Sequence, residues 1–386
     1  MRVLYHHRTA SDDGQAVHIR EMQAAFRRAG HELQEVALVR RGGGGRPSAL
    51  GAMWGRAPGF VREIAEHGYN LAGLRALTRA IADFRPDVLY ERYALSTTCG
   101  SDAAARAGVP FVLEVNSPLA DEVERTRGLS FPGLARRAER RTLGKAAVVA
   151  VVSGALREWA AGLGVDRGRL VWTPNGVDLA RFAPGPKRPD LLRSFDLEGR
   201  TVVGFTGFVR EWHRLDLAID AIAPLADRGV ALLVVGDGPA LADLRDRARA
   251  LGVERAVRFA GKVSHEAIPD HVRLFDVAIV PAINPYASPL KLFEYLAAEI
   301  ASVVVDQPNL REVLDDGAAR FVPAGDAAAL RSAIGELADD PAKRRALAAA
   351  GRRCLLERDY TWDANVRRVL DALAARTSAA TVGARR

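Results

Sequence analysis

The residues best suited to chemistry lie at 281–298, a stretch that follows an apolar run typical of a buried strand. Ser288 is predicted to cap a helix that begins at Pro289, because serine accepts hydrogen bonds from the first helical N–H groups and proline tolerates the first turn. The unbonded N–H groups near Leu290 and Lys291 would then form an anion-binding end, and the Lys291 ammonium adds a full charge beside them. The pattern predicts a phosphate site.

Glu294 follows Lys291 by three residues, so both side chains are expected on one face of the helix. A carboxylate placed beyond a phosphate-binding helix end suits a pair of sugar hydroxyls, as in a nucleotide ribose. Taken alone, the pattern fits a surface ion pair on an ordinary helix equally well.

Two glycines, Gly236 and Gly238, lie in a Gly-Asp-Gly-Pro turn between a predicted strand and a predicted helix. Glycine lets the backbone approach a ligand closely, and a tight structural turn explains the pattern equally well. The third glycine of the dinucleotide-binding fingerprint is absent, so that class of site is not predicted.

A basic segment follows the first strand of the second half of the chain, directly after Gly207. Arg210, His213 and Arg214 are predicted to meet a diphosphate at this strand end. The alternative is an exposed arginine-rich loop with Trp212 packed on the sheet.

Polar residues also end two predicted strands of the first half. His6 and His7 end the first strand, and Gly14 precedes the first helix, where glycine would let a phosphate or sugar approach the helix end. The histidine pair has no third ligand nearby in the sequence, so no zinc site is predicted, and histidines of the core or of a loop are the favoured interpretation. Glu114 and Asn116 end a later strand, where a buried carboxylate needs partners. A substrate contact by Glu114 or Asn116 is favoured slightly over a purely structural role.

These residues need a scaffold of alternating strands and helices. Strands are predicted at 2–7, 33–39, 87–91, 111–115, 146–152 and 170–173, and again at 201–206, 231–235, 257–260, 277–280, 302–305 and 320–322. Nearly continuous apolar strands separated by helices indicate parallel sheets covered on both faces, in an α/β, doubly wound architecture. We predict a mobile loop from Gly42 to Gly59, a helix over roughly 70–84 and a linker over 176–200. Two such domains are expected to bind ligand at the carboxyl ends of their strands.

The bulk composition is that of an ordinary globular protein, with 386 residues, 48% hydrophobic and 26% charged. The first residues lack the shape of a signal peptide, and the longest apolar run, 146–156, is too short to span a bilayer. Two distant cysteines predict neither a disulfide framework nor a zinc site, so the cytoplasm is the expected compartment. The net charge of +8 comes without a nucleic-acid motif, so no nucleic-acid partner is predicted.

A basic set of side chains recurs at helical spacing and could meet an anionic membrane, although a solvated helix face is favoured: Arg136, Arg137, Arg140, Arg141 and Lys145.

Taken together, the motifs resemble the retaining glycosyltransferases of the GT-B fold, family-four type (glycosyl transferases group 1), over nearly the whole chain. The matching stretches are the Gly14 loop with the Gly30–Leu33 turn, Pro174–Asp178 with Phe182, the turn at Gly236–Pro239, the segment Phe259–Val263 and the helix after Trp362. The resemblance implies that Lys262 and Val263 lie near the nucleotide base. It also implies that Glu294 binds the donor ribose. The helix start predicted above places Ser288, Pro289 and Leu290 at the diphosphate.

Several positions depart from the family pattern. The first of the family's two glutamates would fall at Tyr286, and the arginine and lysine that hold the donor diphosphate would fall at Phe208 and His213. Trp212 with His213 looks like the variant that some members carry. Asn116 falls near the place of the usual catalytic histidine, so Lys291, His213 and Asn116 are the predicted catalytic residues.

The resemblance implies two Rossmann-like domains, 1–180 on the acceptor side and 181–358 on the nucleotide-sugar side, with helix 359–377 crossing back and a disordered tail at 378–386. It implies sugar transfer from a nucleoside diphosphate donor, UDP- or GDP-linked, to a glycan, lipid-linked or small-molecule acceptor. Because helix N-termini and fixed cations can stabilise the leaving diphosphate, neither a metal nor a cofactor is expected. His6, His7, Glu114 and Tyr286 are expected on the acceptor or sugar side. The expected location is cytoplasmic, with peripheral contact at the inner membrane face left open. A catalytically altered sugar-nucleotide-binding protein and a sugar-nucleotide epimerase are the alternatives.

Overall fold

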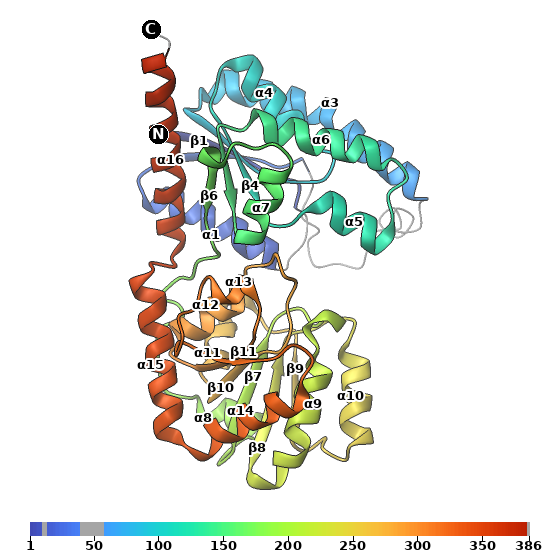
Figure 1. Ribbon diagram of the computed structural model, residues 1–386, viewed down its shortest axis with the longest axis vertical. Helices are drawn as coiled ribbons and strands as arrows, with labels where there is room; N and C mark the ends of the chain where they lie inside the picture. The colour runs from blue at the N-terminus through green and yellow to red at the C-terminus, as the bar shows by residue number, and fades with distance from the viewer. Residues whose placement is uncertain (10–13, 39–57, 384–386) are drawn as a thin grey trace. The chain divides into compact units, whose positions relative to one another are not determined.

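The computed structural model describes residues 1–9, 14–38 and 58–383 and divides into two compact units. Unit 1 comprises Met1–Pro174 and the chain from Trp362 onward, and unit 2 comprises Asn175–Thr361. Strands and helices alternate in both units (Figure 1). Most of the loop predicted between Gly42 and Gly59 lies outside the described residues.

Unit 1 is built on a parallel sheet with the strand order β2-β1-β3-β4-β5-β6. The strands are β1 (Arg2–His6), β2 (Glu32–Val36), β3 (Val88–Arg92), β4 (Phe111–Val115), β5 (Val148–Val151) and β6 (Leu170–Trp172). The order steps from β1 to β2 on one side and from β1 to β3 on the other, as in a doubly wound sheet. The predicted strands of the first half of the chain are confirmed.

The helices of unit 1 cover its sheet, and the register of the strands tells which side chains share a face. The helices are α1 (Gly14–Arg28), α3 (Gly59–Phe84), α4 (Cys99–Ala107), α5 (Leu119–Arg127), α6 (Pro132–Lys145), α7 (Gly154–Gly162) and α16 (Trp362–Gly383). Neighbouring residues of a strand point to opposite faces. Tyr90 and Arg92 therefore point toward the face where α1 and α16 pack, whereas Glu91 points toward α3 and α4.

Two helix boundaries differ from the sequence prediction. The helix expected over 70–84 begins at Gly59, because Glu63 is buried and accepts hydrogen bonds from the N–H groups of Ser130 and Phe131, which fixes the first turns. The tail expected to be disordered from 378 continues as helix α16 to Gly383. Its alanine- and threonine-rich sequence lacks the glycine or proline that would end a helix earlier.

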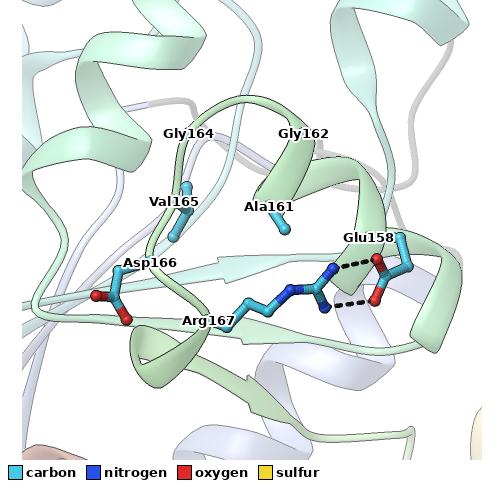
Figure 2. A pocket seen from close by; sticks show the side chains of 7 residues that line it. All are labelled: Glu158, Ala161, Gly162, Gly164, Val165, Asp166 and Arg167. Atoms are coloured by element: carbon cyan, nitrogen blue, oxygen red, sulfur yellow. Dashed lines mark hydrogen bonds and ion pairs between the residues drawn. The ribbon is translucent and has the colours of Figure 1, made fainter.

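A pocket of about 560 Å³ lies between the end of α7 and the short 3-10 helix Arg167–Arg169 that precedes β6 (Figure 2). Arg167 spans it and donates to both carboxylate oxygens of Glu158, at 2.7 and 2.6 Å. Because Arg167 comes just before β6, the pocket lies at the amino edge of the parallel sheet. Ligands of doubly wound folds bind at the opposite, carboxyl edge.

Unit 2 repeats the design with the parallel strand order β12-β11-β10-β7-β8-β9. The strands are β7 (Thr201–Thr206), β8 (Val230–Val235), β9 (Val257–Gly261), β10 (Val277–Val280), β11 (Ala301–Val305) and β12 (Arg320–Val322). The helices are α8 (Pro189–Ser194), α9 (Leu215–Ile222), α10 (Leu241–Ala250), α11 (Ile268–Val272), α12 (Leu290–Ala297), α13 (Pro308–Arg311), α14 (Ala327–Asp339) and α15 (Pro341–Glu357). The six strands predicted for this half are confirmed, and the expected linker 176–200 contains α8.

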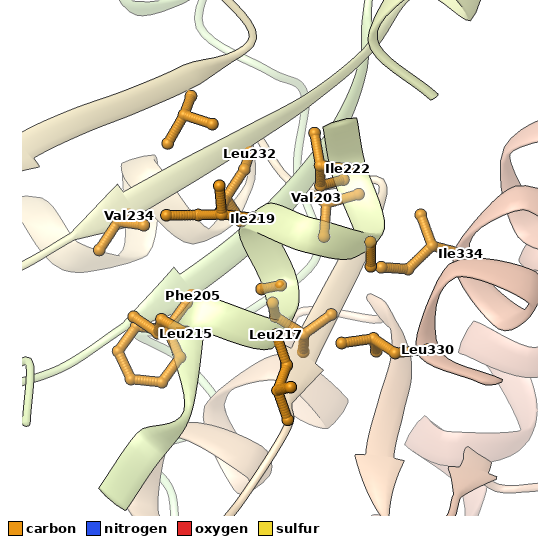
Figure 3. Packing of buried hydrophobic residues seen from close by; sticks show 14 of the residues in the cluster. Val203, Phe205, Leu215, Leu217, Ile219, Ile222, Leu232, Val234, Leu330 and Ile334 are labelled. Carbon is orange, nitrogen blue, oxygen red and sulfur yellow. The ribbon is translucent and has the colours of Figure 1, made fainter. Parts of the chain in front are cut away.

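The core of unit 2 lies between α9, α14 and one face of the sheet (Figure 3). Its aliphatic and aromatic side chains are almost fully buried and include Val203, Phe205, Leu215, Ile219, Leu232, Val234, Leu330 and Ile334. Burying one such side chain stabilises a fold by roughly 1.5–3 kcal/mol, so this layer holds the carboxyl ends of β7 and β8 in place.

Candidate functional site

The glycines after β7 and β8 let two loops pack backbone against backbone at the carboxyl edge of unit 2. Gly207 and Gly236 both have φ +135°, and a Cβ on Gly236 would lie 2.0 Å from the Gly207 carbonyl oxygen. A Cβ on Gly238 would lie 2.1 Å from the carbonyl oxygen of Val209. The fold itself therefore requires glycine at Gly236 and Gly238, which accounts for them as a structural turn.

Lys291 lies directly against this glycine turn. A Cβ on Gly207 would lie 3.1 Å from both Cε and Nζ of Lys291, and Nζ is 4.2 Å from the centre of the Phe205 ring. The His213 Nε2 atom is 3.4 Å from the same Nζ. The structure therefore brings Gly207, His213 and Lys291 together at the end of β7, from three separate segments.

The protonation states of this group are set by burial. Burial, together with the charges of Lys291 and Arg210, lowers the pKa of His213 to about 2. Burial also lowers the pKa of Lys291 to about 8, against the opposing effect of the Glu294 carboxylate. At neutral pH the imidazole is neutral, while most of the ammonium is charged.

The tautomer of His213 follows from its other nitrogen. Nδ1 accepts a hydrogen bond from the backbone N–H of Arg210 at 3.3 Å, so the ring proton of the neutral imidazole lies on Nε2. Nε2 and the Lys291 ammonium are thus two hydrogen-bond donors side by side. An anionic oxygen between them would satisfy both, which is the chemistry of a phosphate site.

The helix after this site starts one residue later than predicted. Helix α12 begins at Leu290, and Pro289 occupies the capping position without a side-chain hydrogen bond. The Ser288 hydroxyl instead accepts from the backbone N–H of Asn175 at 3.0 Å, so the prediction that Ser288 caps the helix is wrong. The N–H groups of Leu290 and Lys291 still precede the first helical bond, which Leu292 donates to the Pro289 carbonyl.

The arginines of the loop after β7 have other partners. Arg214 donates to the Asp216 carboxylate at 3.0 and 2.9 Å, which compensates its charge locally. Arg210 lies over the rings of Phe208 and Trp212, at 4.6 and 5.0 Å from their centres. Trp212 is 48% exposed, so it does not pack on the sheet as the alternative reading expected.

The remaining unit 2 candidates lie on neighbouring segments of the same edge. Glu294 is half-buried on α12, and Tyr286 is half-buried in the loop before it. Lys262 and Val263 follow β9, where the Gly261 carbonyl accepts from the N–H of Gly236, so this segment adjoins the glycine turn.

In unit 1, Glu114 is the centre of a buried polar cluster at the end of β4. One carboxylate oxygen accepts from Arg92 at 2.7 Å and from Asn116 Nδ2 at 2.6 Å, and lies 2.9 Å from His18 Nε2. The other oxygen accepts from the Tyr90 hydroxyl at 2.6 Å. Burial would raise the pKa of Glu114, but the nearby charges of His18 and Arg92 and the hydrogen bonds hold it well below its usual range.

A second polar cluster lies on the opposite face of the same sheet. His6 Nδ1 contacts the Glu91 carboxylate, and His6 Nε2 lies 3.1 Å from the Tyr69 hydroxyl. Among the described residues, His6, Glu91 and Cys99 form the one group whose ligand-type atoms lie within 4.8 Å of one another. Both histidine nitrogens already have partners, and burial with the Glu91 charge raises the pKa of the Cys99 thiol to about 12. A hydrogen-bonded cluster fits these groups better than a metal centre does.

His7 and Gly14 complete the unit 1 candidates. His7 is 1% exposed, with Nε2 at 2.7 Å from a Glu35 carboxylate oxygen and Nδ1 accepting from the N–H of Thr9. Gly14 is exposed and is the first residue of α1. His7 is therefore held inside the fold, whereas Gly14 lies at an accessible helix end.

Sequence reasoning missed most of the partners of Glu114, namely His18, Tyr90 and Arg92. One signal was available, since the apolar strand β3 ends in the charged pair Glu91-Arg92. Arg92 lies opposite Glu114 in the pairing of β3 with β4. His18 lies on helix α1, and no pattern in the sequence indicates that it contacts Glu114.

The basic residues of α6 that were considered for membrane contact are partly paired with acids. Arg136 contacts Glu124, and Arg141 and Lys145 both contact Asp102. Within the residues described by the structure, no helix is both long enough and apolar enough to cross a membrane.

Comparison with known proteins adds two family matches. Residues 13–181 match the model described as Glycosyltransferase Family 4, and residues 200–340 match the model described as Glycosyl transferases group 1.

Two curated relatives illustrate the sequence similarity. The chain is 30% identical over 262 residues to the GDP-mannose-dependent alpha-(1-6)-phosphatidylinositol monomannoside mannosyltransferase of Mycolicibacterium smegmatis, over 65% of this chain and 68% of the relative. It is 33% identical over 230 residues to the D-inositol 3-phosphate glycosyltransferase of Kineococcus radiotolerans, over 54% of this chain and 52% of the relative. The chain thus spans about half the length of the second relative.

Among solved structures, Anabaena HepE in complex with UDP superposes with a TM-score of 0.71 at 16% identity, over 97% of this chain and 100% of that one. At this identity the likeness shows the fold alone, and with the two parallel sheets it confirms the predicted GT-B class.

Proposed function

Since the chain belongs to the glycosyl transferases group 1, with a family-four amino-terminal half, we propose that it transfers a sugar from a nucleoside diphosphate to an acceptor hydroxyl with retention of configuration. The observation that carries the proposal is the pair of donors at the end of β7, the Lys291 ammonium and the Nε2–H of neutral His213. A diphosphate oxygen between these two donors would accept a hydrogen bond from each of them.

In the proposed reaction the bond between the sugar and the diphosphate breaks, and negative charge develops on the leaving oxygen. Fixed donors stabilise such charge without reorganising during the reaction, and Lys291, His213 and the N–H groups that open α12 are suited to this task. We infer that this stabilisation needs neither a metal nor a cofactor.

The position of Tyr286 bears on the stereochemical course. A phenol there cannot form a glycosyl-carboxylate, so we infer attack from the face that the diphosphate leaves. The acceptor hydroxyl then forms the new glycosidic bond, and its proton passes to the departing diphosphate oxygen. In this scheme Glu294 binds the ribose hydroxyls, and the segment of Lys262 and Val263 lies beside the base.

The donor and acceptor classes are proposed from the relatives. One relative is named as GDP-mannose-dependent and HepE was solved with UDP, which supports a GDP- or UDP-linked donor for this chain. The relatives' names include a phosphatidylinositol mannoside and an inositol phosphate, which supports a lipid-linked glycan or a small polyol acceptor.

Peripheral membrane contact from the cytoplasmic side is part of the proposal. Four exposed apolar side chains lie on two adjoining helix starts of unit 1: Phe60 and Ile64 on α3, and Phe131 and Leu134 at the start of α6. The two helix starts are joined by Glu63, which accepts from the N–H of Phe131. Such a patch would suit an acceptor carried on a lipid.

A thermal-shift panel with UDP, GDP, TDP and ADP tests the donor assignment, because a ligand that binds the native state raises the melting temperature. One or two of the four nucleotides should stabilise the protein, and the Glu294→Ala variant should lose most of that shift. Release of the matching nucleoside diphosphate from its sugar donor should accompany sugar transfer. Absence of a shift with all four nucleotides would count against the proposal.

A second candidate is a protein that binds a sugar nucleotide without transferring the sugar. Phe208 and His213 occur where the family carries a diphosphate-binding arginine and lysine, and Phe208 is 46% exposed. Binding in the panel without any transfer or hydrolysis of the donor would favour this candidate.

The nucleotide shift should depend on pH through Lys291. Its pKa of about 8 means that between about pH 7 and about pH 9 the side chain changes from mostly charged to mostly neutral. Diphosphate affinity should therefore fall roughly tenfold over this range, because the charged fraction of a group with this pKa falls about tenfold between the two pH values. Nucleotide titrations at the two pH values measure this change.

The stability of the unliganded protein should instead increase with pH over part of this range. The pKa of Lys291 is lower in the folded than in the unfolded chain, so above about pH 8 the unfolded chain holds more protons and the Lys291 contribution to stability rises with pH. A Lys291→Met variant should lose both trends. Equal nucleotide affinity at both pH values in the unmodified protein would contradict the assignment.

A further inference from the structure

The carboxylate of Glu114 is buried and is surrounded by partners from the protein itself. One oxygen accepts from Arg92 and Asn116, with His18 Nε2 2.9 Å away, and the other accepts from the Tyr90 hydroxyl, so both oxygens already have protein partners. The residue is also only 1% exposed. A role in direct substrate contact, expected from the sequence, does not fit this environment.

We propose that Glu114 is a positioning residue that acts through Asn116, whose side-chain amide binds a non-reacting hydroxyl group of the bound substrate. The proposal rests on the sugar-transfer function proposed above. It assigns to the β4 end of unit 1 a hydrogen-bonding subsite for a sugar or polyol hydroxyl.

The geometry of Asn116 supports this role. Its Nδ2 donates to Glu114 at 2.6 Å, and the amide oxygen lies on the opposite side of the amide carbon. Turning an asparagine amide by 180° exchanges its oxygen and its nitrogen and changes its shape little. The Glu114 carboxylate selects the orientation in which Nδ2 faces it and Oδ1 faces away. The Oδ1 atom has no hydrogen-bond partner among the residues that the structure describes, and the side chain is half-buried at the carboxyl end of β4.

The chemistry of the reaction restricts what Asn116 binds. The reacting acceptor hydroxyl has one proton, and that proton leaves toward the diphosphate oxygen in the scheme above. It cannot also be donated to Oδ1. The hydroxyl that Asn116 accepts from is therefore a neighbouring one, and its binding orients the substrate rather than activating it.

The rest of the cluster holds Glu114 still. Arg92 projects from β3 on the same face as Glu114, and His18 comes from α1, where its ring packs edge-on against Trp362 at 4.8 Å. Side chains from β3 and α1 thus hold one carboxylate in place. If the Glu114 carboxylate could move, the Asn116 amide could rotate and exchange the positions of its oxygen and nitrogen.

A double-mutant cycle tests the proposal, with Glu114→Gln, Asn116→Ala and the two combined. The readout is kcat and KM for release of GDP from GDP-mannose or UDP from UDP-glucose, with methyl mannoside as a soluble acceptor. Each single change should lower kcat/KM by roughly 100-fold, the order of loss caused by misplacing a substrate. The double variant should be no worse than Asn116→Ala alone, because Glu114 acts through that residue.

Matched controls separate positioning from general damage. Glu139 is a second buried carboxylate of unit 1, and it accepts from the Tyr93 hydroxyl at 2.7 Å. Glu139→Gln and Tyr93→Phe should leave kcat/KM within about twofold, whereas Tyr90→Phe, a milder change than Glu114→Gln, should lower it. The nucleotide-induced thermal shift reports on unit 2 and should be the same in every variant.

Two outcomes would overturn the proposal. Losses that multiply in the double variant would show that Glu114 contributes independently of Asn116. Unchanged kinetics in Tyr90→Phe and in Glu114→Gln would show that the cluster is purely structural. Failure of the broader function looks different, since the unmodified protein would then show no nucleotide shift and no donor turnover.

Discussion

Replacing Lys291 by methionine is expected to lower kcat for sugar transfer by on the order of 100- to 1,000-fold. Methionine keeps the apolar stem beside Gly207 and Phe205, so the change removes the charge with little loss of packing. Removing one preorganised donor to a developing negative charge typically costs this much in turnover. Steady-state kinetics of nucleoside diphosphate release measure the effect.

The matched control is Lys343→Met, which removes an exposed lysine that pairs with Glu336 on the surface of unit 2. It should leave kcat unchanged, because exposed ion pairs contribute little. Circular dichroism would confirm that both variants are folded. If Lys291→Met kept full turnover, the phosphate site at the end of β7 would have to be assigned to other cations.

Replacing Gly236 by alanine is expected to unfold unit 2 or to lower its melting temperature severely. The new Cβ would lie 2.0 Å from the Gly207 carbonyl oxygen, at a φ of +135° that side chains rarely adopt. Strain of the backbone alone costs about 1–3 kcal/mol, and separating the two loops adds the loss of their packing. Thermal unfolding of the purified variant is the measurement.

Gly252→Ala provides the comparison, since Gly252 also has a positive φ, +68°, but a Cβ there meets nothing within 4 Å. Its melting temperature should fall by a few degrees only, as expected for about 1–2 kcal/mol of backbone strain. Equal melting temperatures for the two variants would mean that the loops after β7 and β8 can move apart at little cost.

The strands of both sheets could be predicted because their information is local. Runs such as Val277–Val280 are apolar along their whole length, as a strand covered on both faces must be. Turns of glycine and proline mark where each run ends. The doubly wound class follows from that alternation alone.

The details of the site depended on contacts between distant residues. Ser288 has the sequence of a helix cap, yet its hydroxyl is taken by Asn175, which lies 113 positions away in the chain. Lys291 and Glu294 were found because both belong to one short segment. The neutral state of His213 could not be predicted, since it results from burial and from Lys291, which comes from another element.

The acceptor-side candidates show the same limit. Glu114 and Asn116 were identified from their place at a strand end, but the groups that surround the Glu114 carboxylate come from β3, α1 and the residue just after β4. The sequence alone could not distinguish a carboxylate that touches substrate from one that holds a neighbour.

Unit 2 is inserted into unit 1, because the chain leaves unit 1 after Pro174 and returns to it at Trp362. Within unit 2 the two ends of the insertion are pinned together by the bridge between Val177 and Thr361. Once unit 2 has folded, the whole insertion therefore acts as a short tether for the docking of α16 on α1. Folding of unit 2 thus supplies the entropic cost of bringing Pro174 and Trp362 together. The docking of α16 in unit 1 therefore depends on the folding of unit 2.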